Sequence, residues 1–564
     1  MRDEVPVADG GEEGVTDGDE EGVSDGDRGA VTDGGEDAPA ARDDGPVTLD
    51  GESLTPADVV AVAREGARVV VPPAAREAVR TARERVENVL ESEEAVYGLN
   101  TGFGDLVDTR IAREDVDALQ LNLLRSHAAG TGRDLAPEEV RALLCTRINA
   151  LAKGYSGVRE VVLDHLVAML NHEIHPVVPS RGSLGASGDL APLAHAALVL
   201  VGEGEAHTPE GRLPGEEALA RAGLDPLALR AKEGLALING TQLTVGLAAL
   251  LVEDAARLLR AADAAGALTT EVSMGSTAAA DPAIQEVRPH AGQAESARNV
   301  KRCCADSEIV ESHRNCDRVQ DAYSIRCLPQ VHGAVRDAVA HLREAVTVEL
   351  NSATDNPLVF PPGAVDRRTS GTDAADVVSG GNFHGAPLAH RLDYVTGALT
   401  DLAAIAERRV DRLLNPHVQE DHLPPFLASE SGLQSGYMLA QYTAAALVDE
   451  NRTEGRPAVD NTPVSGNQED HVSMSATSAL AARRTLDRSR TAVAVELCCA
   501  AQAAEFVDEE LAHGVGTGAA YAAVRDVVDP LEADRPPAPD VEAVATLIES
   551  GTLDRALAAA MDEW

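Results

Sequence analysis

The chain has 564 residues, of which 93 are acidic and 48 are basic, so its formal net charge is −45. This charge and an aromatic content of 2% argue against a nucleic-acid-binding protein, because such proteins neutralise phosphates with basic surfaces and stack bases on aromatic rings. The apolar runs are shorter than the ~18 residues that cross a bilayer, and the acidic N-terminus does not resemble a secretory signal, so we expect a soluble cytoplasmic protein without nucleic-acid or membrane partners.

The acidic excess is spread along the whole chain. Residues 1–50 hold 17 acidic and 3 basic residues, a net charge of −14, and the other 514 residues hold 76 and 45, a net charge of −31. Such dense like charges repel one another over a Debye length, which is about 10 Å at 0.1 M salt and about 3 Å at 1 M. Together with only 3 lysines against 45 arginines, this composition indicates a halophilic protein.

Residues 1–46 consist largely of Gly, Asp, Glu, Val and Ala in loose near-repeats such as GEEGV and DEEGV. A segment of this kind cannot bury enough apolar surface to offset its chain entropy. We predict a disordered acidic extension, with the ordered chain beginning near Val47.

The ordered part is predicted to be mainly α-helical. Pro137 is typical of a helix start and Gly154 of a helix end, and between them apolar residues recur at 3.6-residue spacing, namely Val140, Leu143, Leu144, Ile148 and Leu151. Longer helical runs cover about 240–268, 329–351, 385–414 and 473–513, whereas 361–376 and 533–540 look like solvent loops. We expect an N-terminal active-site domain over 47–240, a central bundle of long helices over 241–525, and a helical tail over 526–564.

The seven cysteines indicate free thiols and no metal centre. An odd, sparse number in a large chain does not suggest a disulfide framework, and no group of them has zinc-ligand spacing. The tetrapeptide from His172 to His175 is not HExxH, so its two histidines lack the spacing of a helical zinc site.

Polar, glycine-rich junctions separate the long helical runs. Loops that join rigid helices often carry functional groups. These junctions are rich in Gly, Asn, Gln, Tyr and Ser, and they span Tyr97–Gly104, Ser126–Gly130, Gly182–His195, Asn239–Gln242, Arg318–Arg326, Gly380–His384 and Asn467–His471.

The third junction contains Ala186, Ser187 and Gly188. Gly188 has no side chain, so its nitrogen can approach the Ala186 carbonyl with little steric cost and close a five-membered ring. Loss of water there and from Ser187 would leave an exocyclic methylidene, an electrophile that none of the twenty side chains provides. On the tripeptide alone, a Gly/Ser turn before a helix is the simpler interpretation.

The run GSLGASGDLAPLAH closely resembles the signature of the aromatic amino acid ammonia-lyases, and every other junction resembles a motif of that family in the same order, over about residues 50–525. The resemblance implies a mainly helical fold of the fumarase/aspartase-like superfamily and a homotetramer whose active sites are each built from three subunits. It also implies no metal and no added cofactor. The prosthetic group would be a 4-methylidene-imidazol-5-one formed autocatalytically from Ala186, Ser187 and Gly188, with Ser187 becoming 2,3-didehydroalanine.

Two positions resemble the histidine-specific members of the family. His127 follows Ser126, where phenylalanine and tyrosine enzymes usually have Phe-Leu or His-Leu, and Glu469 stands where those enzymes usually have Gln. An imidazole and a carboxylate suit an ionisable ring better than a phenyl ring, which would leave both unpaired. The resemblance thus implies deamination of L-histidine to trans-urocanate and ammonia. Taken without it, His127 reads as a packed helix-end histidine and Glu469 as a helix N-terminal carboxylate.

The remaining roles also come from the resemblance. It implies a general base at Tyr97, a substrate-carboxylate anchor at Arg326, residues lining the electrophile at Tyr323 and Gln320, a hydrogen-bond donor to the ring carbonyl or substrate at Asn239, and a packing residue at Phe383. Whether the substrate amine or its imidazole ring adds to the electrophile stays open. Gly466 departs from the alanine that is common before the last motif.

Three other interpretations compete with this one. A related aromatic ammonia-lyase or aminomutase is disfavoured by His127 and Glu469. A non-catalytic helical scaffold would be free to lose Ser187, Tyr97 and Arg326, and all three are present. A thiol or metal protein lacks ligand spacing.

Overall fold

The computed structural model describes residues 45–91, 115–314, 316, 318–365, 370–372, 375–459, 461–562 and 564. Residues 46–564 form one compact unit. The predicted disordered extension, 1–46, lies outside the described residues except for its last two positions, and so does the junction that contains Tyr97.

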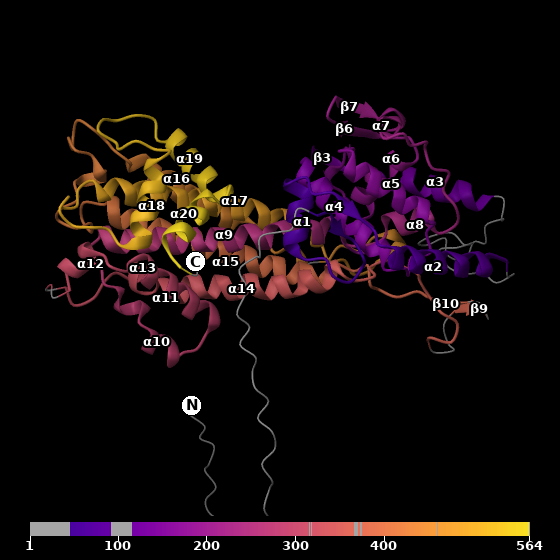
Figure 1. Cartoon of the computed structure of the whole chain (residues 1–564), viewed down its shortest axis with the longest axis horizontal. Coiled ribbons are helices and arrows are strands. Elements are labelled where there is room, and N and C mark those ends of the chain that lie inside the picture. The colour runs from indigo at the N-terminus through magenta and orange to yellow at the C-terminus, as the bar shows by residue number, and fades with distance from the viewer. Residues whose placement is uncertain are drawn as a thin grey trace, which may run out of the picture. The chain divides into compact units, whose positions relative to one another are not determined.

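The N-terminal part of the unit is a cluster of short helices with small sheets at its edges (Figure 1). Its helices are α1 (Pro56–Arg64), α2 (Pro73–Glu91), α3 (Val116–His127), α4 (Pro137–Ala152), α5 (Glu160–Asn171), α6 (Leu190–Leu200), α7 (Gly215–Arg221) and α8 (Glu233–Ile238). Its strands are β1 (Val47–Thr48), β2 (Val69–Val70), β3 (Thr131–Asp134), β4 (His175–Pro176), β5 (Pro179–Arg181), β6 (Glu205–Thr208) and β7 (Gly211–Pro214). β1 pairs with β2 in parallel. β3 pairs antiparallel with β5, and β6 pairs antiparallel with both β4 and β7.

Helix α4 starts and ends where the sequence predicts. Pro137 is its first residue and Gly154, with φ +79°, follows its last turn in the left-handed region that favours glycine. A side-chain contact at the start, in which Glu139 accepts from the Ala136 amide at 2.7 Å, stabilises the first turn.

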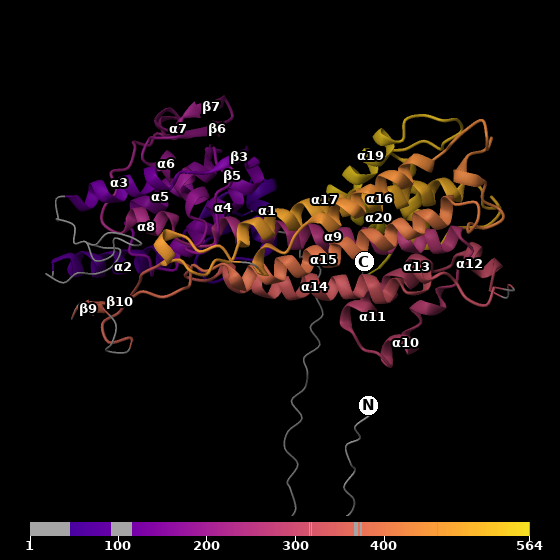
Figure 2. The ribbon, with the colours of Figure 1, turned by 180° about the vertical axis from the view of Figure 1, so that it is seen from behind.

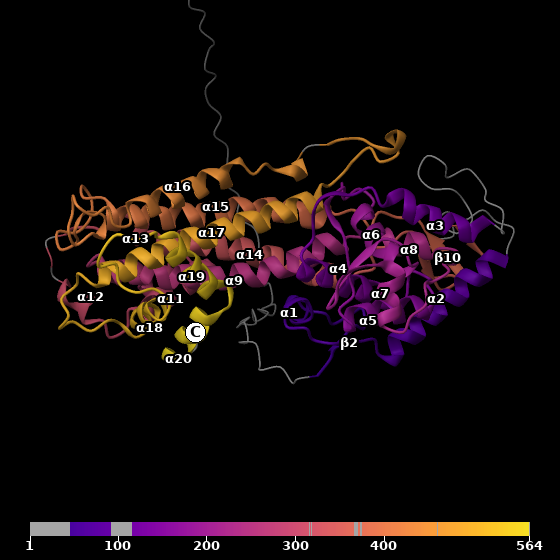
Figure 3. The same ribbon diagram turned by 90° about the horizontal axis from the view of Figure 1, so that it is seen from above.

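Four long helices form the central bundle, as predicted: α9 (Gln242–Val272), α14 (Leu328–Leu350), α15 (Ala386–Leu414) and α17 (Ser475–Ala504). α17 packs on both α15 and α9, α14 packs on α15 and α9, and the four lie side by side in the views of Figures 1 and 3. α9 is buried on nearly all sides, which its continuous Ala, Leu and Val content explains. α11 (Ala291–Cys303) and α16 (Met438–Thr453) cover the outside of the bundle.

Buried charges in the bundle are paired. Asp263 on α9 accepts from His332 Nδ1 at 2.7 Å and from Arg336 at 2.8 Å, and Arg409 on α15 is bidentate to Glu496 on α17. Losing one member would leave an uncompensated buried charge, so these pairs specify the register between the long helices.

Short helices and a C-terminal group complete the bundle end. The short helices are α10 (Pro282–Glu286), α12 (Glu308–Ser312) and α13 (Tyr323–Arg326). Here and elsewhere, the described residues include 3₁₀ turns at Thr277–Ala280, Pro425–Leu427, Pro457–Val459 and Ser465–Asn467, the last of them in the turn that carries Glu469. α18 (Val515–Arg525), α19 (Ala538–Glu549) and α20 (Thr552–Ala560) follow α17. α19 packs on α17 and α20 on α18. Among the described residues, no helix has the length and apolar character needed to cross a membrane.

Three sequence predictions are wrong in detail. The loop predicted over 533–540 ends early, because α19 begins at Ala538. The run 473–513 is not one helix: α17 ends at Ala504, and the chain then turns so that the Gly514 amide and His513 Nδ1 donate to the buried Glu271, at 2.8 and 2.7 Å. Glu271 thus accepts four short hydrogen bonds, since Ser307 and Thr517 also donate to it. These hydrogen bonds to a charged group stabilise the turn more than further helical residues would.

The segment 361–376 is not wholly a solvent loop. It contains β9 (Ser370–Thr372) and the start of β10 (Ala375–Val378), which pair antiparallel with each other and with β8 (Leu358–Phe360). Ala375 and Val377 point to one face and pack with Val359 in a small apolar cluster, and this period-2 pattern is hidden by the polar residues before it.

Candidate active site

The tripeptide Ala186–Gly188 lies in the short link between β5 and α6, just before the buried Asp189. Asp189 accepts from Ser183 Oγ at 2.8 Å and from the Thr244 amide at 2.8 Å. Burial raises the pKa of Asp189, although these donors partly oppose the shift. The carboxyl group therefore ties the tripeptide to the first turn of α9.

Gly188 is pressed against the chain at Gly240. Its φ is +78°, and a Cβ at this position would lie 2.2 Å from the Gly240 carbonyl oxygen. That same oxygen accepts from the Asp189 amide at 2.7 Å. No residue other than glycine fits here without displacing backbone, and the compressed geometry is compatible with the predicted ring closure.

Two side chains contact Ser187. Its Oγ donates to Glu469 Oε1 at 2.9 Å, and its carbonyl accepts from Asn239 Nδ2 at 2.8 Å. Asn239 Oδ1 is buried and has no hydrogen-bond partner among the described residues. One acceptor is therefore available beside the tripeptide.

Two distant loops hold the tripeptide link from its other side. The Gly185 carbonyl accepts from Ser473 Oγ at 2.9 Å and from the Gly385 amide at 3.1 Å, and the Leu184 carbonyl accepts from the Met474 amide at 2.7 Å. These contacts bring the loops that carry Phe383 and Glu469 to the tripeptide. Phe383 is half-buried, two residues before Gly385.

The turn that carries Glu469 has an unusual backbone. Ser465, Gly466 and Asn467 all have positive φ, at 52°, 62° and 70°, and the Val464 amide donates to the Glu469 carbonyl at 3.0 Å. Glycine at 466, where alanine is common in the family, suits the left-handed conformation of this turn.

His127 lies at the C-terminus of α3, near Glu469. Burial lowers its pKa, against the opposing effects of the Leu123 carbonyl and the Glu469 charge, so the ring is neutral at neutral pH. Nδ1 lies 2.9 Å from the Leu123 carbonyl oxygen, a contact that requires Nδ1 to carry the proton. Nε2 is then the unprotonated nitrogen, able to accept a hydrogen bond from an N–H group.

A second cluster of predicted residues surrounds α13. Arg326 Nη1 donates to Gln320 Oε1, and the Arg326 guanidinium lies 5.7 Å from the Tyr323 ring centroid. Tyr323 is 74% exposed. The cluster therefore presents an arginine and a phenol at the surface of the bundle end.

The two clusters lie at opposite ends of α9. Asp189 contacts Gly240 just before α9 begins, whereas Arg318 donates to the Ser273 carbonyl just after α9 ends, at 3.2 Å. α9 has 31 residues, which at ~1.5 Å per residue separates its ends by about 45 Å. Figures 1, 2 and 3 all place α13 and α8 at opposite ends of the unit. One chain therefore brings together Ser187, Asn239, His127 and Glu469, but not Arg326, Tyr323 and Gln320.

Sequence reasoning missed a residue that supports this site. Arg147 on α4 is completely buried, and its Nη1 donates to the Asn239 carbonyl at 3.0 Å and to Gln242 Oε1 at 2.7 Å. Burial lowers its pKa to about 10. The sequence could have indicated this residue, because Arg147 interrupts the apolar face of the helix predicted after Pro137.

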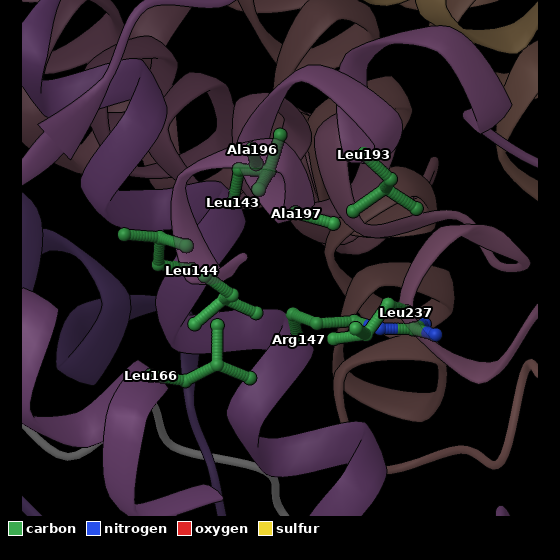
Figure 4. Close-up of a pocket in the computed structure, with 9 residues that line it drawn as sticks. Leu143, Leu144, Arg147, Leu166, Leu193, Ala196, Ala197 and Leu237 are labelled. Atoms are coloured by element: carbon green, nitrogen blue, oxygen red, sulfur yellow. The ribbon is translucent and has the colours of Figure 1, made fainter. Parts of the chain in front are cut away.

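A small cavity beside Arg147 is not the substrate site. Figure 4 shows the Arg147 side chain among apolar neighbours, and the lining consists of Leu143, Leu144, Leu166, Leu193, Ala196, Ala197, Leu200, Leu237 and Arg147. The cavity has a volume of about 10 Å³, which is about enough for one water molecule and too small for an amino acid.

The cysteines in the described residues are free, and no three His, Cys, Asp or Glu side chains there are arranged to hold a metal ion. Burial raises the pKa of Cys145 and of Cys498 to about 12, so these thiols are unreactive.

Comparison with known proteins identifies the family. The sequence model of the aromatic amino acid lyase family matches residues 54–526, and the chain belongs to that family. It is 62% identical over 516 residues to a probable histidine ammonia-lyase of Halobacterium salinarum, covering 92% of this chain and 98% of that protein. It is 51% identical over 515 residues to a histidine ammonia-lyase of Gloeobacter violaceus, covering 91% and 98%.

Solved structures have the same fold. A tyrosine aminomutase of Streptomyces globisporus matches with a TM-score of 0.86 and 39% identity, over 92% of this chain and 99% of that one. A histidine ammonia-lyase of Trypanosoma cruzi matches with a TM-score of 0.83 and 38% identity, over 92% and 96%. The predicted mainly helical fold class is confirmed.

Proposed function

We propose that this chain is a histidine ammonia-lyase, a carbon–nitrogen lyase that converts L-histidine to trans-urocanate and ammonia at the start of histidine degradation. The observation that carries the proposal is that His127 lies close enough to Glu469 to be affected by its charge, and that Glu469 accepts a hydrogen bond from Ser187. Both His127 and Glu469 can accept from the N–H groups of an imidazole ring, whereas a phenyl ring would leave both unsatisfied. The substrates of the aminomutases of this fold lack that ring.

The prosthetic group proposed for this site is the 4-methylidene-imidazol-5-one made from Ala186, Ser187 and Gly188. The residues fit it: Gly188 is held against Gly240 where no Cβ can enter, and Asn239 donates to the Ser187 carbonyl. When formed, the group supplies an electrophile that activates the substrate for loss of ammonia.

The chain's other side chains bind substrate and move a proton. His127 Nε2 and the Glu469 carboxylate orient the imidazole, and Arg326 pairs with the substrate carboxylate, for which its planar guanidinium is suited. Tyr97 takes the proton from the substrate Cβ. Tyr323 and Gln320 line the site from the Arg326 cluster, and Phe383 packs beside the reacting centre.

A self-assembled homotetramer completes the site. Histidine spans only a few ångströms, so Ser187 and Arg326, separated by about 45 Å along α9, can serve one substrate only if they come from different copies of the chain. We propose that each site combines residues of three subunits, in the cytoplasm, with no metal or added cofactor.

The direct test of the function is incubation of purified protein with L-histidine, following urocanate by its ultraviolet absorbance. The same protein should not act on L-tyrosine or L-phenylalanine at a comparable rate. Faster turnover of either would favour the alternative, an aromatic ammonia-lyase or aminomutase.

Replacing His127 by leucine should weaken histidine use far more than any trace use of phenylalanine. Loss of a polar contact in a desolvated site costs about 1–3 kcal/mol, so kcat/KM for histidine should fall about 5- to 150-fold. The control is His390→Leu at an exposed position on α15, which should leave kcat/KM unchanged. Equal losses on both substrates would show that His127 has a structural role only.

The assembly should require molar salt. Residues 51–564 carry a net charge of −31, and a tetramer brings four such charges together. The repulsion between subunits falls as the Debye length shrinks from about 10 Å at 0.1 M salt to about 3 Å at 1 M. In ~0.1 M salt, we expect sedimentation to show dissociation together with loss of activity. Deleting residues 1–46 should leave this dependence nearly intact, because a flexible tail can move its charge away. A tetramer fully active in low salt would contradict the halophilic interpretation.

A further inference from the structure

One contact in the site can exist only before the prosthetic group has formed. Ser187 Oγ donates to Glu469 Oε1 at 2.9 Å, and this hydroxyl oxygen is lost when the tripeptide matures. The contact is one that the unprocessed chain can make, because Ser187 as translated still has its hydroxyl. In the precursor, the Glu469 carboxylate, which is proposed to bind the substrate, is therefore hydrogen-bonded to the serine that reacts.

We propose that Glu469 has a second role, in maturation: it holds the Ser187 hydroxyl in one orientation while the tripeptide loses water. This inference rests on the proposed function. It gives one side chain two successive partners, the Ser187 hydroxyl before maturation and the substrate imidazole afterwards.

The chemistry balances without an oxidant or reductant. A bond forms between the Gly188 nitrogen and the Ala186 carbonyl carbon, and the Ala186 oxygen leaves as water with the amide protons of Gly188 and Ser187. Ser187 Oγ leaves as the second water, taking its own proton and the Ser187 Cα proton. The electron pair of the Cα–H bond becomes the Cα=Cβ double bond.

Orientation matters for the second loss. The Cβ–Oγ bond must stand out of the ring plane so that it overlaps with the electron pair released at Cα. A serine side chain has three staggered χ1 positions, and the hydrogen bond to Glu469 selects one of them. Asn239 holds the Ser187 carbonyl on the other side, so both polar ends of the serine are fixed.

The backbone that carries Glu469 is held independently of Ser187. The Val464 amide donates to the Glu469 carbonyl at 3.0 Å, across the left-handed turn through Gly466. On the far side of Glu469, Asn461 donates to the Asp470 carbonyl at 2.6 Å and accepts from the Val472 amide at 2.9 Å. The acceptor is therefore part of a fixed loop, whose anchoring does not depend on the serine.

In maturation, residue 469 needs only an acceptor oxygen within hydrogen-bond distance of the Ser187 hydroxyl. Variants of Glu469 can therefore separate its role in maturation from its role in substrate binding. Glu469→Gln keeps an amide oxygen at the same reach, Glu469→Asp keeps the charge but withdraws it by one methylene, and Glu469→Ala removes the acceptor. Substrate binding, by contrast, should suffer in all three variants.

The test follows maturation over time and does not depend on turnover. Wild type and the three variants are made by cell-free synthesis, samples are quenched by denaturation, and the proteolytic peptide containing Ser187 is weighed. Wild type and Glu469→Gln should lose two waters at similar rates. Glu469→Ala and Glu469→Asp should mature at least about tenfold more slowly, the effect expected for a lost hydrogen bond to a charged group. Circular dichroism checks that each variant is folded.

Arg326→Ala is the matched control, because it lies at the other end of α9 and should mature at the wild-type rate while losing turnover. Maturation of Glu469→Ala at the wild-type rate would overturn the inference, and so would a Glu469→Gln variant as slow as Glu469→Ala. If the wild type turned over histidine with both waters retained, the proposed prosthetic group itself would be wrong.

Discussion

Replacing Ser187 by alanine is expected to reduce histidine turnover by several orders of magnitude while leaving the fold intact. The substitution removes one hydroxyl, whose side-chain partner among the described residues is Glu469, so little stability is lost. Without that oxygen the second water cannot leave and no electrophile forms. The remaining side chains can bind histidine but cannot activate its amino group for departure.

Intact mass provides the independent measurement. The wild-type chain should be lighter than its translated sequence by about two waters, whereas Ser187→Ala should not show this full loss. Ser352→Ala is the matched control, since this hydroxyl donates only to the nearby Val348 carbonyl at the end of α14. It should have full activity and the mature mass. A wild type of full translated mass that still produces urocanate would refute the assignment of Ser187.

Mixing two inactive variants is expected to restore activity if the site is shared between subunits. Ser187→Ala disables one cluster and Arg326→Ala the other, and the clusters lie about 45 Å apart along α9 in a single chain. If they come from different copies, tetramers assembled at random from equal amounts should have both clusters intact in about one quarter of their sites. The measurement is urocanate formation by co-expressed, co-purified chains, relative to wild type.

The control pairs two variants within one cluster. Ser187 and Glu469 contact each other in the same chain, so co-expressed Ser187→Ala and Glu469→Ala chains have no intact copy of that cluster and should remain inactive. Absence of recovery in the Ser187–Arg326 mixture, with tetramers shown by sedimentation to contain both chains, would contradict the shared site.

Local patterns were sufficient for the helices and for the first cluster. The apolar spacing after Pro137 predicted α4, and the long Ala/Leu/Val runs predicted α9, α14 and α15 to within a few residues, because such helices depend on their own periodicity. The tripeptide and the polar pair of His127 and Glu469 were visible as residue types in recurring motifs. Tyr97 stays a prediction, since it lies outside the described residues.

Other features depended on partners far along the chain. Where α17 ends is decided by Glu271, more than 200 residues earlier, and the strands after residue 369 form because β8 offers them an edge. The role of Arg147 likewise arises only when α4 meets the loop at Asn239. Local sequence patterns contain no information about contacts between distant residues. They could therefore indicate which residues are unusual but not which residues these contact.

By itself, the sequence determined the chemistry: an Ala-Ser-Gly tripeptide whose glycine has no side chain to hinder ring closure, an imidazole and a carboxylate for an ionisable ring, and a strongly acidic composition. Only the tertiary structure decided which of these residues meet. It places Ser187, Asn239 and Glu469 together through hydrogen bonds between residues that are 52 and 282 positions apart in the chain, and it places Arg326 at the far end of α9. The physical reason is that a long rigid helix sets a distance between its ends that no side chain can span.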